Sequence, residues 1–208
     1  MSTEIYLARH GQSEWNADTS GDRLNGRTDV DLLEIGYGQA ERLARALAGA
    51  RLAAVYSSPL KRARETARAV AEQQGTELVI KEWLSEIECG EWEGLSLAEV
   101  ERRDPGYFAR WLNDPALFPF PGGEGIYDVA ARVMPPLAQL VLQHDGETIL
   151  LVCHKIVSCV ILAHYLGVHP SGARRLVPQR TAALNHLVVE ASRAITIRAL
   201  DDHTHLYR

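Results

Sequence analysis

The sequence predicts a three-layer α/β/α sandwich with a mostly parallel central sheet and a small helical cap insertion. Short apolar runs that suit buried strands alternate with longer segments whose apolar residues recur at helical spacing. A less regular stretch, punctuated by prolines, interrupts this alternation in the middle of the chain. At 208 residues the chain fits one domain, residues 1–208, with the cap insertion at about residues 92–125.

The first half of the chain carries the patterns of three strands and two helices. In order they are a strand at 4–8, a helix at 35–47, a strand at 52–56, a helix at 59–74 and a strand at 77–80. The polar residues 11–26 predict a long loop beside a pocket. Ser58 and Pro59 suit the N-cap and the first position of the second helix.

The second half begins with the proline-rich cap and returns to the alternation. Its expected elements are short helices at 96–103 and 107–113, a long helix at 126–143, a strand at 148–153, a helix ending near 166, and strands at 185–189 and 194–198. Pro135 and Pro136 are expected to kink or divide the long helix.

Composition excludes several classes of function. The net charge of −5 argues against general nucleic-acid binding, and no apolar run approaches the ~20 residues that a membrane helix needs. The apolar run at 5–8 is too short for a signal peptide. Cys89, Cys153 and Cys159 are typical of reduced thiols, so we expect a cytoplasmic protein.

Reactive side chains stand where predicted strands end. Arg9 and His10 follow the first strand, His154 follows the strand at 148–153, and Arg62 lies one turn into the helix after the second strand. Ligands of parallel sheets bind outside the carboxyl ends of the strands. These side chains meet in one cup if their strands are neighbours.

Two guanidiniums and two imidazoles in one cup suit a dianionic oxyanion, of which phosphate is the common one. One neutral imidazole can attack phosphorus and form a phosphohistidine, while the other stabilises charge on the transferred group. Such a cup works without a metal ion, and we expect no metal and no cofactor. The spacing of Cys153, His154, Cys159 and His164 fits no common zinc pattern.

The leaving alkoxide needs a proton, and Glu86 is the candidate donor. A carboxyl group that faces a bound phosphate dianion is favoured in its protonated form by like-charge repulsion. It can then act as general acid in the first step and activate water in the second. Glu88, Glu91 and Glu93 are competitors that composition alone does not separate from Glu86.

Six short motifs follow one another along nearly the whole chain. They are Arg9-His10-Gly11 with Trp15-Asn16, residues 57–67 around Arg62, residues 86–94, Pro121-Gly122-Gly123-Glu124, Val152-Cys153-His154, and Leu200-Asp201-Asp202 with His205-Leu206. Together they resemble the signatures of the histidine phosphatase superfamily, in the branch that contains cofactor-dependent phosphoglycerate mutase. The resemblance implies a three-layer α/β fold and a mechanism through a phosphoenzyme without a metal. It also favours a homodimer.

The resemblance further implies roles for individual residues. They are phosphate acceptor for His10, phosphate cradle for Arg9, Arg62 and His154, a further phosphate contact for Asn16, and proton donor for Glu86. The chain departs from the family's usual pattern at three positions. Lys155 stands where glycine is often found, Gly125 where serine often caps a helix, and Leu33 where Ser or Thr often does.

A phosphomonoester hydrolase is the function that we expect. The presumed cap at 92–125 holds three arginines against six carboxylates, a net charge of −3, which disfavours a second phosphate. The chain is also shorter than the mutases of the family usually are. A cofactor-dependent phosphoglycerate mutase and a non-catalytic phosphate-binding regulatory module are the alternatives.

The substrate is expected to be a small phosphorylated metabolite. Arg23, Arg27, Lys155 and His205 are the candidates for contacts with its carboxylate or sugar. Lys155 either adds attraction for a second anionic group or points to solvent.

Overall fold

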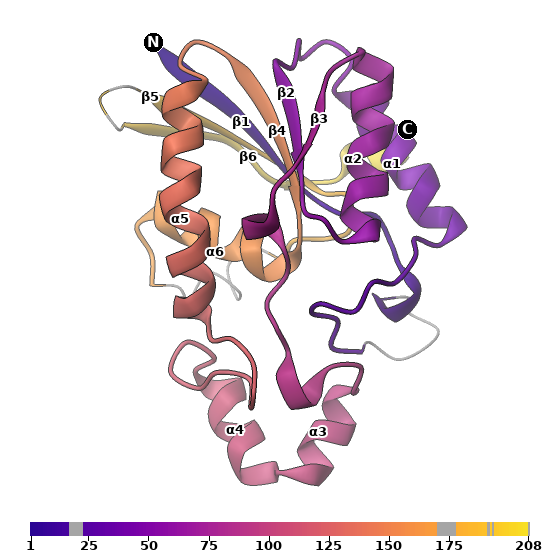
Figure 1. The fold of residues 1–208 in the computed structure, drawn as a ribbon, viewed down its shortest axis with the longest axis vertical. Coiled ribbons are helices and arrows are strands. Elements are labelled where there is room, and N and C mark those ends of the chain that lie inside the picture. The colour runs from indigo at the N-terminus through magenta and orange to yellow at the C-terminus, as the bar shows by residue number, and fades with distance from the viewer. Residues whose placement is uncertain (17–22, 170–177, 191, 193, 208) are drawn as a thin grey trace.

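The computed structural model describes residues 1–16, 23–169, 178–190, 192 and 194–207. Within them, six strands form one sheet in the order β3-β2-β4-β1-β5-β6 (Figure 1). Strands β1 to β4 run parallel to one another, and β5 and β6 add antiparallel strands at one edge, so the expected mostly parallel sheet is confirmed. The strands are β1 (Ser2–Arg9), β2 (Ala54–Ser57), β3 (Leu78–Ile80), β4 (Thr148–Cys153), β5 (Leu184–Glu190) and β6 (Ile195–Asp202).

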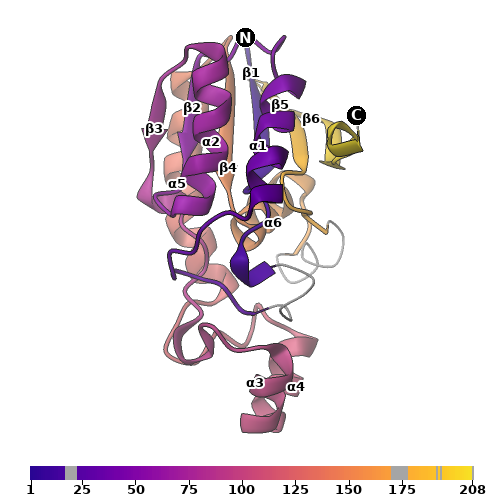
Figure 2. The same cartoon turned by 90° about the vertical axis from the view of Figure 1, so that its right-hand side faces the viewer.

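Helices cover both faces of the sheet and complete the three predicted layers. Helices α1 (Glu34–Ala46) and α2 (Lys61–Gln74) lie on one face, and α5 (Ile126–Gln143) and α6 (Lys155–Leu166) lie on the other (Figures 1 and 2). Successive side chains of a strand point to opposite faces. Accordingly, Leu150 and Val152 belong to the apolar core under α1 and α2, whereas Ile149 and Leu151 belong to the core under α5 and α6.

The register of β4 with its two neighbours brings the reactive strand ends together. Arg9 of β1 pairs with Cys153 of β4, and Ser57 of β2 pairs with Val152. His10 and His154 therefore lie side by side, each directly after the carboxyl end of its strand. The neighbouring strands on which the predicted cup depends are present.

Two helices lie beyond the carboxyl ends of these strands (Figure 1). α3 (Leu97–Arg103) and α4 (Pro105–Asn113) lie at the far end of the molecule, within the expected cap insertion (Figure 1). Trp92 joins them to the rest of the chain, because its ring lies 5.3 Å from that of Trp111 and 5.6 Å from that of Phe120, centroid to centroid.

The expected start of the second helix is wrong. α2 begins at Lys61 with Leu60 as its N-cap, so Ser58 is not the cap and Pro59 is not the first helical residue. The Ser58 hydroxyl instead bonds with Nε2 of His154 at 2.8 Å and accepts the Leu60 N–H at 3.2 Å. A capping residue must aim its oxygen at the first turn of the helix, and this hydroxyl has another partner.

α5 runs unbroken through Pro135 and Pro136, so the expected division of this helix is wrong. Pro135 lies on the exposed side of the helix, where water can bond the carbonyl left without an amide donor. On the opposite side Val133 and Leu137 are completely buried and hold the helix on the sheet. No helix of the described residues is long and apolar enough to cross a membrane.

Candidate active site

His10 is held at the end of β1 by close packing of the chain around Gly11. The Gly11 N–H donates to Oγ1 of Thr66 on α2 at 3.0 Å. A Cβ atom on Gly11 would lie 2.5 Å from the carbonyl oxygen of Gly36, so only glycine fits here. The His10 side chain is 4% exposed, which leaves its ring a fixed place at the base of the pocket.

The hydrogen bond of the His10 ring fixes its tautomer. Nδ1 lies 2.7 Å from the carbonyl oxygen of Gly11. Because a carbonyl oxygen only accepts, Nδ1 carries the proton and Nε2 keeps its lone pair in the neutral ring. Burial and the nearby Arg62 and Arg9 guanidiniums hold the pKa of His10 well below its usual 6.5. At neutral pH His10 is therefore an uncharged imidazole with a nucleophilic nitrogen.

His154 lies beside His10, with the two ring centroids 5.1 Å apart. The side chain is completely buried, and Nε2 bonds with the Ser58 hydroxyl. Nδ1 has no hydrogen-bond partner within the described residues, although it is buried. Burial, Arg62, His10 and Arg9 lower the pKa of His154 well below 6.5. An anion between the two rings would offset the charge of the two guanidiniums and would accept a hydrogen bond from Nδ1 in the tautomer that is protonated there.

Arg62 reaches this point from the first turn of α2. It is 1% exposed and donates from its two terminal nitrogens to the carbonyl oxygens of Thr28 (2.9 Å) and Gly26 (2.8 Å). Its buried Nε finds no hydrogen-bond partner in the described part of the chain. Burial lowers the pKa of Arg62 to about 10, against the opposite effect of Glu86, so the guanidinium stays charged at neutral pH.

Arg9, the other arginine of the predicted phosphate cradle, is the last residue of β1. Its guanidinium donates to the carbonyl oxygen of Gln179 at 2.9 Å, and its side chain lines the cavity described below. The four predicted cradle residues are thus brought together by β1, α2 and the end of β4.

Glu86 lies on the other side of the cradle with its carboxylate held by main-chain donors. Oε1 accepts the Ile87 N–H at 2.9 Å, and Oε2 accepts the Ile156 N–H in the first turn of α6 at 3.2 Å. Since Ile156 follows His154 by two residues, this contact ties the carboxyl group to the segment that carries the second histidine. The side chain is 6% exposed.

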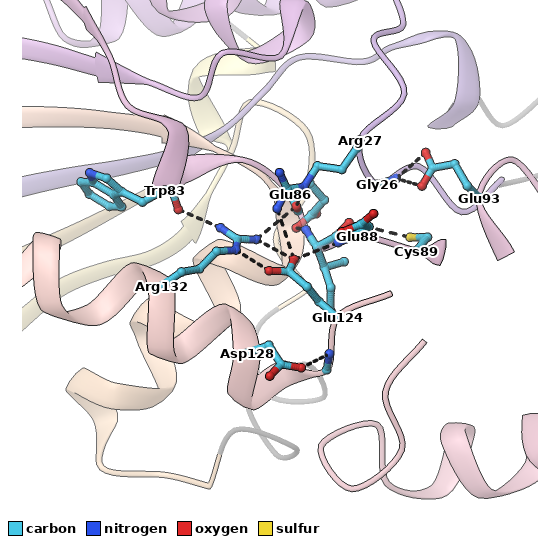
Figure 3. A network of polar contacts seen from close by, with 12 residues as sticks. Gly26, Arg27, Trp83, Glu86, Glu88, Cys89, Glu93, Glu124, Asp128 and Arg132 are labelled. Atoms are coloured by element: carbon cyan, nitrogen blue, oxygen red, sulfur yellow. Dashed lines mark hydrogen bonds and ion pairs between the residues drawn. The ribbon is translucent and has the colours of Figure 1, made fainter. Parts of the chain in front are cut away.

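Two arginines that the sequence patterns do not predict for this role, Arg27 and Arg132, hold the main chain of Glu86. Arg27 Nε donates to the Glu86 carbonyl oxygen at 2.7 Å, and Arg132 donates to it at 3.1 Å (Figure 3). Glu124 joins them, because it bonds with Arg132 at 2.7 Å and accepts the Glu88 N–H at 2.9 Å. Burial, the largest single effect, raises the pKa of Glu124, but the hydrogen bonds from Arg132 and from the Glu88 N–H, with the charges of Arg132 and Arg27, together lower it below its usual value.

The structure separates Glu86 from its three competitors. Glu88 and Glu91 are exposed. Glu93 accepts the N–H group of Gly26 at 3.0 Å (Figure 3). It also accepts the N–H group of Thr28 at 3.1 Å, so it holds the loop whose carbonyl oxygens bind Arg62. Of the four carboxylates, Glu86 is the one that lines the cavity.

A cavity of about 610 Å³ opens above His10. Arg9, His10, Asn16, Arg23, Glu86 and Lys155 line it, as expected for residues that meet a substrate. Arg62 and His154 lie behind this wall, and His205 is half-buried without lining the cavity. Residues 17–22 of the predicted loop at 11–26 lie outside the described residues.

Other lining residues were not singled out from the sequence as substrate contacts. They include Arg180, Thr181, His203, Leu206 and Tyr207, from the segment before β5 and from the C-terminal turn. Leu206 belongs to a motif of the resemblance but was not predicted to contact substrate, and no short motif marks the other four residues, because they reach the cavity only after β5 and β6 have folded back beside β1.

A family model described as the histidine phosphatase superfamily (branch 1) matches residues 5–202. The chain belongs to this superfamily. Phosphoserine phosphatase 1 of Hydrogenobacter thermophilus is 36% identical over 165 residues, which span 79% of this chain and 77% of that protein. Glucosyl-3-phosphoglycerate phosphatase of Mycolicibacterium vanbaalenii is 34% identical over 170 residues, spanning 78% and 74%.

Among solved structures, Bacillus stearothermophilus YhfR has a TM-score of 0.89 at 30% identity and covers 98% of this chain and 99% of its own. This confirms the α/β fold expected of a histidine phosphatase. Both relatives carry the name of a phosphatase, which supports a phosphoric monoester hydrolase over the mutase alternative.

Proposed function

We propose that this histidine phosphatase hydrolyses small phosphomonoesters through a phosphohistidine formed on His10, with no metal ion in the reaction. One observation carries the proposal. Nδ1 of His154 and Nε of Arg62 are buried nitrogens without a hydrogen-bond partner in the described residues, and they flank the nucleophilic ring. Buried donors are normally paired, and the Arg62 guanidinium is charged, so its Nε, together with Nδ1 of His154 in the tautomer that is protonated there, suits the oxygens of an anionic phosphoryl group.

In the first step the lone pair of His10 Nε2 attacks phosphorus and the P–O bond to the alcohol breaks. Glu86 in its protonated form gives the leaving oxygen its proton. Arg9, Arg62 and His154 compensate the charge on the three phosphoryl oxygens. Asn16 fits a further phosphoryl contact, because it lines the cavity and its carboxamide oxygen already accepts the Ser13 N–H at 2.6 Å, so its NH₂ group is the part that would donate to phosphate.

In the second step Glu86, now ionised, takes a proton from water as the water oxygen attacks phosphorus. The P–N bond to His10 breaks, inorganic phosphate leaves, and both side chains return to their starting protonation states.

The first test is release of inorganic phosphate from p-nitrophenyl phosphate and from a panel of phosphorylated metabolites. We expect steady turnover by the wild-type protein and its loss, by about 10³-fold or more, in His10→Ala. Exchange of phosphoglycerate isomers with little phosphate release would instead establish the mutase. Binding of phosphate or vanadate with no turnover of any ester would establish the non-catalytic module.

The relatives guide the choice of substrates for this panel. Phosphoserine and glucosyl-3-phosphoglycerate appear in their names, so phosphorylated amino, hydroxy and sugar acids come first. We place the reaction in the cytoplasm, because Cys89, Cys153 and Cys159 are all buried free thiols. A homodimer stays a prediction for a mass measurement in solution.

A further inference from the structure

We propose that Ser58 is a positioning residue of the reaction, whose hydroxyl donates to Nε2 of His154 and so keeps the proton of this ring on Nδ1 for a phosphoryl oxygen. This inference rests on the proposed function and deepens it, because it fixes what the second histidine offers to phosphate. The sequence pattern predicts Ser58 as a helix cap. The structure gives its hydroxyl a different task, 2.8 Å from Nε2 of His154.

The first argument is the set of partners around the Ser58 hydroxyl. A hydroxyl has one hydrogen to donate and two lone pairs that accept. The side chain is completely buried, and its oxygen accepts the Leu60 N–H at 3.2 Å. Within the described residues, Nε2 of His154 is the one acceptor with which this hydroxyl bonds. The hydroxyl therefore donates to Nε2, and a neutral ring that accepts at Nε2 carries its proton on Nδ1.

The opposite tautomer of His154 would leave two buried groups unpaired. If Nε2 carried the proton and donated to Ser58, the hydroxyl hydrogen would have no acceptor in the described part of the chain. Nδ1 would then be a buried acceptor, and it has no donor among those residues either. An anion beside the ring would meet a lone pair instead of an N–H. With the proton on Nδ1, one donor alone lacks a partner, and a phosphoryl oxygen provides it.

The sheet places Ser58 for this contact. Its own N–H donates to the Val152 carbonyl oxygen at 3.1 Å, which continues the pairing of β2 with β4 by one residue. His154 follows Val152 by two residues, so the paired strands bring the serine side chain to the second histidine. Leu60 is the N-cap of α2, and Arg62 lies in the first turn of this helix. One short segment therefore holds both the second imidazole and the buried guanidinium of the cradle.

The two histidines then share one tautomer and have complementary tasks. At His10, the Gly11 carbonyl oxygen holds the proton on Nδ1 and leaves the lone pair of Nε2 for phosphorus. At His154, the Ser58 hydroxyl holds the proton on Nδ1 and leaves this N–H for a phosphoryl oxygen. Burial and nearby guanidiniums lower the pKa of both rings well below 6.5. At neutral pH the tautomer therefore decides what each ring can do.

The tautomer of His154 is measured directly by ¹⁵N NMR of histidine-labelled protein, at pH 7.5 in a buffer without phosphate. Long-range ¹H–¹⁵N correlations identify the nitrogen that carries the proton, and His154→Asn identifies the signals of His154 by their loss. We expect the proton on Nδ1 in the wild-type protein. In Ser58→Ala we expect the averaged shifts of a mixture of tautomers, because neither nitrogen then has a partner. A proton on Nε2 in the wild type, a charged ring at this pH, or the wild-type tautomer in Ser58→Ala overturns the proposal.

Hydrolysis of p-nitrophenyl phosphate measures what the contact contributes to the reaction. Ser58→Ala should lower kcat/KM by about 10-fold, at the lower end of the range for one hydrogen bond to a charged group. Ser58→Thr keeps the hydroxyl and should recover most of this loss together with the wild-type tautomer. Wild-type kcat/KM in Ser58→Ala would refute the role of Ser58. An equal loss in Ser58→Thr, with the wild-type tautomer retained, would assign the effect to packing and overturn the proposal as well.

Ser158→Ala is the matched control, because it removes the same atom from another completely buried serine close to His154. Its hydroxyl bonds with Sγ of Cys153 at 3.3 Å, and its N–H donates to the carbonyl oxygen of His154, not to the ring. This variant should keep both the tautomer and kcat/KM of the wild type, and a loss equal to that of Ser58→Ala would overturn the proposal. Absence of turnover in the wild-type protein would refute the hydrolase itself, whereas the tautomer, measured without substrate, would still decide the hydrogen bond.

Discussion

Nδ1 of His10 is fixed as a donor by the Gly11 carbonyl oxygen 2.7 Å away, and this single contact decides which nitrogen attacks. The same surroundings keep Nε2 unprotonated, because burial and two guanidiniums lower the pKa of His10 well below 6.5. The site thus meets two opposing needs at one residue. It is cationic enough to attract a phosphate dianion, and this same charge keeps its nucleophile neutral.

The role of Glu86 leads to a prediction about leaving groups. Glu86→Gln should lower kcat for an alkyl phosphate by about 10²- to 10⁴-fold, because the alkoxide leaves without its proton. The loss with p-nitrophenyl phosphate should be much smaller, since p-nitrophenolate leaves without protonation. Initial rates with both esters measure the difference. An equal loss with the two esters would contradict the assignment of Glu86 as general acid.

The candidate catalytic residues could be predicted from the sequence, but the residues that hold them in position could not. His10 and His154 directly follow strong apolar strands, so their place at the sheet edge follows from the pattern. Arg132 and Glu93 act instead on main-chain groups far away in sequence, at Glu86 and Gly26. Such contacts depend on how separate segments pack, and no local spacing encodes them.

At the scale of elements, the loop at 26–28 links Glu93 to Arg62. Glu93 accepts two N–H groups of this loop, and Arg62 donates to two of its carbonyls. A Cβ atom on Gly26 would lie 2.4 Å from the Ile87 carbonyl oxygen, so only glycine fits at this point of the loop. The carboxylate of Glu93 therefore positions the guanidinium of Arg62 through the loop.

Glu93→Gln should weaken this support, because an amide NH₂ group would face the N–H of Gly26. We expect kcat/KM to fall by about 10-fold, within the range for leaving a buried donor unpaired, and mainly through KM. The loss should be equal for alkyl and p-nitrophenyl phosphates, since Arg62 contacts the phosphoryl group in both. The exposed Glu91 offers the control Glu91→Gln, which should be silent. A loss confined to alkyl phosphates would make Glu93 the general acid.

The element boundaries show where sequence patterns suffice. α5 and β4 have the predicted bounds, because long apolar periodicity and a continuous apolar run are strong signals. The start of α2 was predicted wrongly at Ser58, where the side chain serves His154 instead of the helix. The preference of serine for the helix N-cap is overridden at Ser58, because its hydroxyl bonds with His154, which follows another strand.

At the scale of the whole molecule, two buried imidazoles couple the stability of the fold to pH. The pKa of His10 and of His154 is well below 6.5 in the folded protein and returns to about 6.5 on unfolding. Below pH 6.5 the unfolded chain therefore binds protons that the folded chain does not. The free energy of unfolding should fall as the pH drops below 6.5, with a limiting slope of about 1.4 kcal/mol per pH unit for each histidine.

Urea denaturation between pH 7.5 and 5 measures this slope. His154→Asn should reduce this slope by up to about 1.4 kcal/mol per pH unit, the contribution of one bound proton. The same change at the exposed His164 should leave the slope as it is. A slope that is identical in the wild-type protein and in His154→Asn would contradict the burial of a neutral imidazole beside Arg62.

The proposed mechanism depends on a covalent bond between phosphorus and Nε2 of His10. Rapid quenching into base during turnover of a ³²P-labelled ester, followed by peptide mapping, tests it most directly, because phosphohistidine survives base and is lost in acid. We predict a base-stable, acid-labile label on the peptide that contains His10, and no label in His10→Ala. Full turnover with no labelled protein at any quench time, or a label on a peptide that lacks His10, would contradict the account.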